Sequence, residues 1–138
     1  ATLDGSRFSS HNLAGKVAVV DLWSTWCGPC LKEIPHLNEL SRQYADEEFA
    51  VVGVTLQSGW ARDIKQDFEK LDIQTSYPIL VGDDDVEEAF GGVLAFPTTL
   101  LIGKDGRIHK KYVGATEDKT AQMDQEIRAL LAEPAADQ

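Results

Sequence analysis

The sequence has no apolar run that approaches the roughly 18 residues of a membrane-spanning helix. Basic residues are few, since 13 lysines and arginines stand against 23 aspartates and glutamates, for a net charge of −10. Nucleic acid carries an anionic backbone, and this chain has no basic stripe with interleaved aromatic residues, so binding to nucleic acid is not expected. Cysteine is also scarce: Cys27 and Cys30 are the only two in 138 residues.

The two cysteines lie in the segment Trp26-Cys27-Gly28-Pro29-Cys30. An apolar run precedes this segment and a helical pattern follows it, so the predicted order is strand, short turn, helix. The cysteines would then lie at a helix N-terminus, where unpaired N–H groups and the helix dipole stabilise a negative charge. Because the thiolate is the reactive form of cysteine, this placement lowers the pKa of Cys27 and points to thiol–disulfide exchange.

Two other interpretations of the cysteine pair are weaker. A purely structural disulfide would close a very small loop, and the entropy removed from the unfolded chain decreases with loop size. A structural zinc site needs about four ligands. The three histidines, His11, His36 and His109, are scattered and have no finger-like spacing to the cysteines, so no metal is expected.

The pattern of apolar segments predicts alternating strands and helices. Strands are expected over 16–23, 49–56, 77–81, 98–102 and 107–113. Helices are expected over 29–44, 60–71, 86–90 and 118–132. Residues 3–15 indicate a turn, a short edge strand and a loop. This order predicts an α/β fold with a mixed central sheet flanked by helices, whose last two strands form a hairpin at Asp105-Gly106.

From about residue 3 to residue 131, the chain resembles the thioredoxin superfamily and, within it, the TlpA/ResA-like branch. The resemblance rests on the Trp26–Cys30 segment, on Pro35 five residues after the second cysteine, on Phe96-Pro97-Thr98 and on Gly114. It implies a single thioredoxin-like domain over 1–138. An N-terminal extension (1–15) and an inserted helix-plus-strand unit (57–82) are features of that branch, and residues 133–138 are expected to form a frayed tail.

Two positions mix features of the superfamily. The dipeptide Gly28-Pro29 between the cysteines is that of general thioredoxins, whereas TlpA/ResA-like proteins vary there. Asp21, six residues before Cys27, matches the buried acid of thioredoxins, where the branch often has Asn. These differences concern the choice of substrate and leave the reaction unchanged.

The expected reaction assigns a role to each cysteine and to a proton acceptor. Cys27 is the expected nucleophile, and Cys30, one turn further into the helix, resolves the mixed disulfide. Cys30 must lose a proton in a buried place, so an acid–base group is expected nearby. Asp21 is one candidate, because it is a lone carboxyl in an apolar strand and burial would raise its pKa. The alternative is an aspartate at the strand end, in water.

Glu33 is the second candidate, because it stands three residues after Cys30 on one helix face. The resemblance implies that a glutamate there tunes the cysteines, and a solvated helix surface is the alternative. The resemblance also implies a cis proline at Pro97, opposite the cysteine pair, where exposed backbone of Phe96 binds an extended substrate by strand addition. From the local sequence alone, Pro97 could equally begin an edge strand. The expected substrate-binding residues are Trp26, Gly28, Pro29, Phe96, Pro97 and Thr98.

The resulting hypothesis is a monomeric reductant of protein disulfides that needs no cofactor beyond its own Cys27–Cys30 disulfide and receives electrons from an upstream dithiol donor. The resemblance implies the periplasm or cell envelope, with a signal or anchor removed, and the reduction of apocytochrome c before haem attachment as one task. Two alternatives stay open. One is a general cytoplasmic thioredoxin-like reductase, and the other is a redox-inactive docking module with the same fold.

Overall fold

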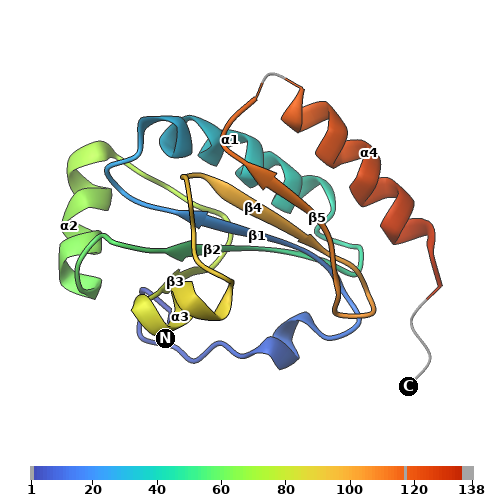
Figure 1. Ribbon diagram of the computed structural model, residues 1–138, viewed down its shortest axis with the longest axis horizontal. Helices are drawn as coiled ribbons and strands as arrows, with labels where there is room; N and C mark the ends of the chain where they lie inside the picture. Colours follow the sequence, from blue (N-terminus) through green and yellow to red (C-terminus); the bar gives the residue numbers. More distant parts are fainter. Residues whose placement is uncertain (1, 117, 135–138) are drawn as a thin grey trace.

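The computed structural model describes residues 2–116 and 118–134. A five-stranded sheet in the order β3-β2-β1-β4-β5 forms its centre (Figure 1). The strands are β1 (Val17–Trp23), β2 (Phe49–Thr55), β3 (Ile79–Val81), β4 (Thr98–Ile102) and β5 (Ile108–Val113). The helices are the 3₁₀ helix η1 (Ser10–Leu13) and α1 (Gly28–Gln43), α2 (Ala61–Leu71), α3 (Asp84–Ala89) and α4 (Lys119–Ala132). This arrangement confirms the predicted mixed sheet with flanking helices.

Strand β1 is the central strand of the sheet. It runs parallel to β2, which is itself parallel to β3, and antiparallel to β4, which pairs with β5. All seven residues of β1 are buried, as expected for a nearly continuous apolar run covered on both faces. Asp21 is therefore placed in the interior by the strand that carries it.

The two faces of the sheet have different covers. Helices α1 and α4 lie over one face, where Ile34, Leu37 and Met123 pack in one core cluster with Val19 of β1. The N-terminal segment and α3 lie over the other face, where Phe8 and Val86 pack against the second cluster. Figure 1 shows these two layers above and below the sheet. The apolar positions of each strand thus bury against a separate cover.

Helix α1 begins at the cysteine pair. Cys27 is its N-cap residue, and the Cys27 sulfur accepts a hydrogen bond of 3.2 Å from the backbone N–H of Cys30. Pro29 lies in the first turn, where a helix N–H has no partner to lose. The predicted start of the helix therefore agrees with the structure to within one residue.

The predicted terminal hairpin is confirmed. The strand predicted over 98–102 is β4 with the same bounds, and the backbone turns back at Gly106, whose φ is +79°. The Gly106 N–H donates to the Gly103 carbonyl at 3.0 Å, and the Gly103 N–H donates to the Arg107 carbonyl at 3.0 Å. A positive φ favours glycine at this position of the turn.

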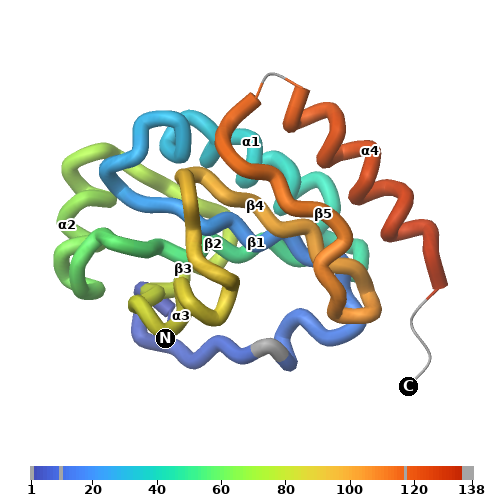
Figure 2. The backbone as a smooth tube through the Cα atoms, viewed as in Figure 1, coloured from blue at the N-terminus to red at the C-terminus, as the bar shows by residue number. Residues whose placement is uncertain are grey.

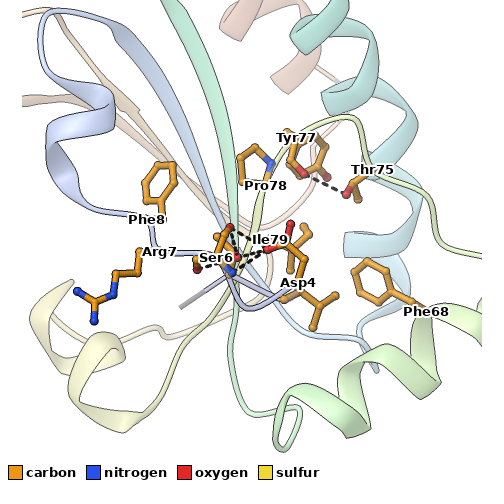
Figure 3. Close-up of a pocket in the computed structure, with 11 residues that line it drawn as sticks. Asp4, Ser6, Arg7, Phe8, Phe68, Thr75, Tyr77, Pro78 and Ile79 are labelled. Atoms are coloured by element: carbon orange, nitrogen blue, oxygen red, sulfur yellow. Dashed lines mark hydrogen bonds between the residues drawn. The ribbon is translucent and has the colours of Figure 1, made fainter.

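The edge strand predicted within residues 3–15 is wrong. Only Thr2 forms a β-bridge, to Leu80, and the chain then turns instead of continuing as a strand. The Asp4 carboxylate holds this turn, because it accepts hydrogen bonds from the Ser6 N–H at 3.0 Å and the Ser6 hydroxyl at 2.8 Å, and also bonds the Thr2 hydroxyl (Figure 3). Such local side-chain bonds compete with a strand ladder.

Two further sequence expectations concern the helices and the chain end. Among the residues that the structure describes, no helix has the length and apolar character needed to cross a membrane. The frayed tail predicted for residues 133–138 lies, from residue 135 onward, outside the described residues.

Candidate active site

Cys27 and Cys30 form a disulfide at the junction of β1 and α1, with their Cα atoms 5.3 Å apart. Their exposure differs in the direction that the expected roles require: Cys27 is 6% exposed and Cys30 is 0% exposed. A reagent in solution therefore reaches the Cys27 sulfur first. The Cys30 N–H that donates to this sulfur is one of the free N–H groups of the helix N-terminus, and it would stabilise a Cys27 thiolate.

The turn that carries the cysteines is held by residues from the segment between β2 and β3. The Thr25 N–H donates to the Ser58 hydroxyl at 3.1 Å, and the Thr25 hydroxyl donates to the Asp67 carboxylate of α2 at 2.7 Å. The indole N–H of Trp26 donates to the Gln57 carbonyl at 2.8 Å. Sequence analysis missed Ser58 and Asp67, because no local pattern marks partners that lie 33 and 42 residues away.

A groove of about 450 Å³ adjoins the disulfide. Trp26, Cys27 and Pro29 form one wall, and residues 93–96 form the other. Trp26 is 63% exposed, and its ring meets that of Phe96 edge-on with centroids 5.7 Å apart. Figure 2 shows the segment between α3 and β4 running up beside the turn that precedes α1. The groove brings together two segments that are about 70 residues apart in sequence.

Phe96 lines the groove, whereas Pro97 and Thr98, which follow it, are buried and are not among the residues that line it. The Phe96–Pro97 peptide bond is cis, and Pro97 is buried. The Pro97 carbonyl accepts from the Gly114 N–H at 2.7 Å, and the Thr98 hydroxyl donates to the Ala95 carbonyl at 2.6 Å. Within residues 2–116 and 118–134, no hydrogen bond uses the Phe96 backbone. Phe96 thus has an N–H and a carbonyl without a partner in that part of the chain.

Asp21 lies in the interior, so the alternative of a strand-end aspartate in water is wrong. It is 1% exposed, and the Thr99 hydroxyl of β4 donates to its carboxyl at 3.1 Å. Burial and, to a smaller extent, the charge of Glu33 raise the pKa of Asp21 to about 7, against the lowering effects of Lys119 and the Thr99 hydrogen bond. A carboxyl of this kind can exchange protons near neutral pH.

Glu33 is paired instead of lying on a solvated helix surface. Its carboxylate oxygens lie 3.0 Å and 3.1 Å from the Lys119 ammonium, and Lys119 is only 4% exposed. The pair joins α1 to the first residue of α4 across 86 positions of sequence. Sequence analysis identified Glu33 but missed Lys119 and Thr99, since only the fold brings them to the two acids.

The site, the sheet and the helices together define a thiol–disulfide oxidoreductase with a thioredoxin fold. The comparisons with known proteins agree. The model of the Redoxin family matches residues 1–130, and the chain belongs to that family. This membership is in keeping with the two cysteines at the N-terminus of α1.

The names of individual relatives fit this class of protein. The thioredoxin-like protein YneN of Bacillus subtilis is 30% identical over 91% of this chain and 72% of its own length. The thiol-disulfide oxidoreductase ResA of Bacillus thuringiensis is 26% identical over 93% of this chain and 71% of its own length. A thiol:disulfide interchange protein of the thioredoxin family from Chlorobium tepidum superposes with a TM-score of 0.80 at 28% identity, covering 96% of this chain and 91% of that one. These similarities confirm the resemblance to ResA-like proteins.

The raised pKa of Asp21 makes stability depend on pH. The unfolded chain holds this proton with a pKa near 3.8 and the folded chain with a pKa of about 7, so folding is penalised progressively as pH rises from about 4 to 7, and the penalty is complete above 7. We expect Asp21→Asn to remove the penalty. The stability of the variant relative to the wild type should increase by up to about 4 kcal/mol between pH 4 and pH 8.

Urea unfolding of the oxidised protein at both pH values measures this change. Asp46→Asn, an exposed carboxyl after α1, serves as the control substitution. A stability difference between Asp21→Asn and the wild type that is the same at pH 4 and pH 8 would contradict the assignment.

Proposed function

We propose that this protein reduces disulfide bonds in other proteins by reversible oxidation of Cys27 and Cys30. The observation that carries the proposal is the graded exposure of the two sulfurs at the start of α1, with Cys27 open to an apolar groove and Cys30 enclosed. The direction of electron flow is supported by Gly28-Pro29, the dipeptide that separates the cysteines in the general thioredoxins, which are reductants.

The reaction proceeds by two exchanges. In the reduced protein, the Cys27 thiolate attacks one sulfur of the substrate disulfide; a bond forms between the Cys27 sulfur and that sulfur, and the other substrate sulfur leaves as a thiolate and takes a proton from water. Cys30 then loses its proton and attacks the Cys27 sulfur. This step forms the Cys27–Cys30 disulfide and releases the second substrate thiolate, so that two electrons pass to the substrate.

The second exchange needs an acceptor for the Cys30 proton, and we assign this role to Asp21. The Asp21 carboxyl is buried, as are both cysteines. Its pKa of about 7 lets it take up and release a proton under physiological conditions. Glu33, one turn beyond Cys30 on α1, adjusts the electrostatics of this exchange through its own charge. The deprotonated form of Asp21 is the working form, so resolution is fastest above its pKa.

The substrate occupies the groove between the redox turn and residues 93–96. An extended segment that carries the disulfide can pair its backbone with the free N–H and carbonyl of Phe96, while its side chains contact Trp26 and Pro29. Backbone pairing makes modest demands on substrate sequence. Gly28 is open to solvent at this surface and leaves room for an approaching chain, and Pro97 and Thr98 hold the Phe96 backbone in place.

The resemblance to the TlpA/ResA-like branch, to which the relatives named ResA correspond, supports a place in the cell envelope, with the disulfide of oxidised apocytochrome c as one class of substrate. We propose that the protein works there as a monomer and is returned to its reduced form by an upstream dithiol protein, which donates its two electrons by the same exchange chemistry. The dithiol of the redox turn is the electron carrier in this scheme.

The two cysteine roles make a prediction. Cys30→Ser keeps the attacking thiol and removes the resolving one, so the first exchange should occur and the second should not. We expect this variant to accumulate a mixed disulfide with a disulfide-containing peptide, seen as an added peptide mass that dithiothreitol removes. Cys27→Ser is the matched control and should accumulate little adduct. Equal trapping by both variants would contradict the assignment.

The role of Asp21 makes a second prediction. The rate of reduction of the same peptide should rise with pH to a plateau, with an inflection near 7 from Asp21. Asp21→Asn should lower the plateau by about 10² or more, because it removes the proton acceptor, and should abolish that inflection. A pH–rate profile that keeps its plateau and inflection in the variant would remove the proposed role.

A further inference from the structure

Lys119 is a buried cation close to the redox site that takes no part in the two exchange steps. It is the first residue of α4 and is 4% exposed. Its ammonium lies 3.0 Å and 3.1 Å from the two oxygens of Glu33 and donates to the Gly114 carbonyl at 3.3 Å. These contacts match the three donors of an ammonium group, so the side chain is fully engaged.

The place of Lys119 is unfavourable for a cation in two ways. Burial removes the water that stabilises its charge, and the first turn of a helix carries the positive end of the helix dipole. The Glu33 carboxylate offsets both costs. An ion pair in this environment is held tightly in one geometry, because separation of its partners would leave two uncompensated charges in the interior.

The pair belongs to a set of titratable groups on β1, α1 and α4 that influence one another's charge. Asp21 comes from β1, and Glu33 and His36 come from α1. The set also includes Glu39 of α1 and Asp124 of α4, whose charges act on His36. Its last member is Tyr77, before β3, on which the charges of Asp21 and Glu33 act. Lys119 is the cation that acts on both Asp21 and His36, lowering the pKa of each, whereas Glu33 raises both.

We propose that Lys119 is a positioning residue of the redox site, which holds the Glu33 carboxylate of α1 in one place and balances its charge, so that Asp21 can accept the Cys30 proton. This inference rests on the proposed role of Asp21. Without Lys119, the Glu33 charge that acts on Asp21 would lose its neutralising partner, and Asp21 would keep its proton to higher pH. The ion pair therefore acts on the chemistry through the two acids and does not touch the substrate.

The test is the pH–rate profile for reduction of a disulfide peptide from pH 5 to 9. We expect Lys119→Met to move the inflection upward by roughly half a pH unit or more, with a corresponding loss of rate at pH 7. Lys119→Arg keeps the charge and should retain most of the wild-type position. If Lys119→Met does not fold, as judged by circular dichroism, Lys119→Gln removes the charge while keeping a donor for Gly114.

Lys104→Met is the matched control, because Lys104 is also largely buried but binds the other end of α4. Its ammonium donates to the Leu131 carbonyl at 3.1 Å and the Glu133 carbonyl at 2.8 Å. We expect this variant to keep the wild-type inflection, since it disturbs α4 but leaves the ion pair between Lys119 and Glu33 intact. A role of Lys119 in stability alone would lower the unfolding midpoint and leave the inflection in place.

The outcomes separate the two proposals. If Asp21→Asn abolishes the inflection and the charge-removing variants of Lys119 leave it at the wild-type pH, the role of Lys119 is overturned and that of Asp21 stands. If the inflection survives Asp21→Asn, both roles are overturned. An inflection that moves to higher pH in Lys119→Met and stays near the wild-type pH in Lys119→Arg supports both roles.

Discussion

The complete burial of β1 is the constraint on which the rest of the structure depends. All seven residues of this strand are enclosed between β2 and β4 and under helices α1 and α4, and one of them is an aspartate. A carboxylate in this position loses its hydration and regains one hydrogen bond, from Thr99. The protonated form of Asp21 is therefore favoured up to about neutral pH. The burial that destabilises the carboxylate thus also gives the group a pKa at which it can exchange protons with a thiol.

The same strand delivers the cysteines to their positions. Where β1 ends at Trp23, the chain makes one turn and α1 begins, so the disulfide lies at once against the core and at the helix N-terminus. The segment between β2 and β3 holds that turn by hydrogen bonds to Thr25 and Trp26. The core thus sets the proton chemistry, and the surface loops set access to Cys27. Because this short turn joins the core to the loops, a change in one is expected to alter the other.

The parts of the molecule that could be predicted from sequence are those with local signals. A pattern within a few residues predicts the environment of three of them: the apolar run of β1, the helix start at Gly28-Pro29 and the lone carboxyl of Asp21. The edge strand expected in residues 3–15 failed because the Asp4 side chain holds a turn, and a side-chain network of this kind competes with the backbone pattern on which strand prediction relies. Lys119 and Asp67 could not be found, because their significance comes only from partners 86 and 42 residues away.

The reduction potential of the Cys27–Cys30 pair tests the central claim most directly. It can be measured by equilibrating the protein with dithiothreitol or glutathione buffers and following tryptophan fluorescence, since Trp23 is packed in the same core cluster as the disulfide. A potential of about −250 mV or lower is the result that a protein-disulfide reductant predicts. A potential above about −150 mV would contradict the account, because the disulfide would then be an oxidant of other thiols.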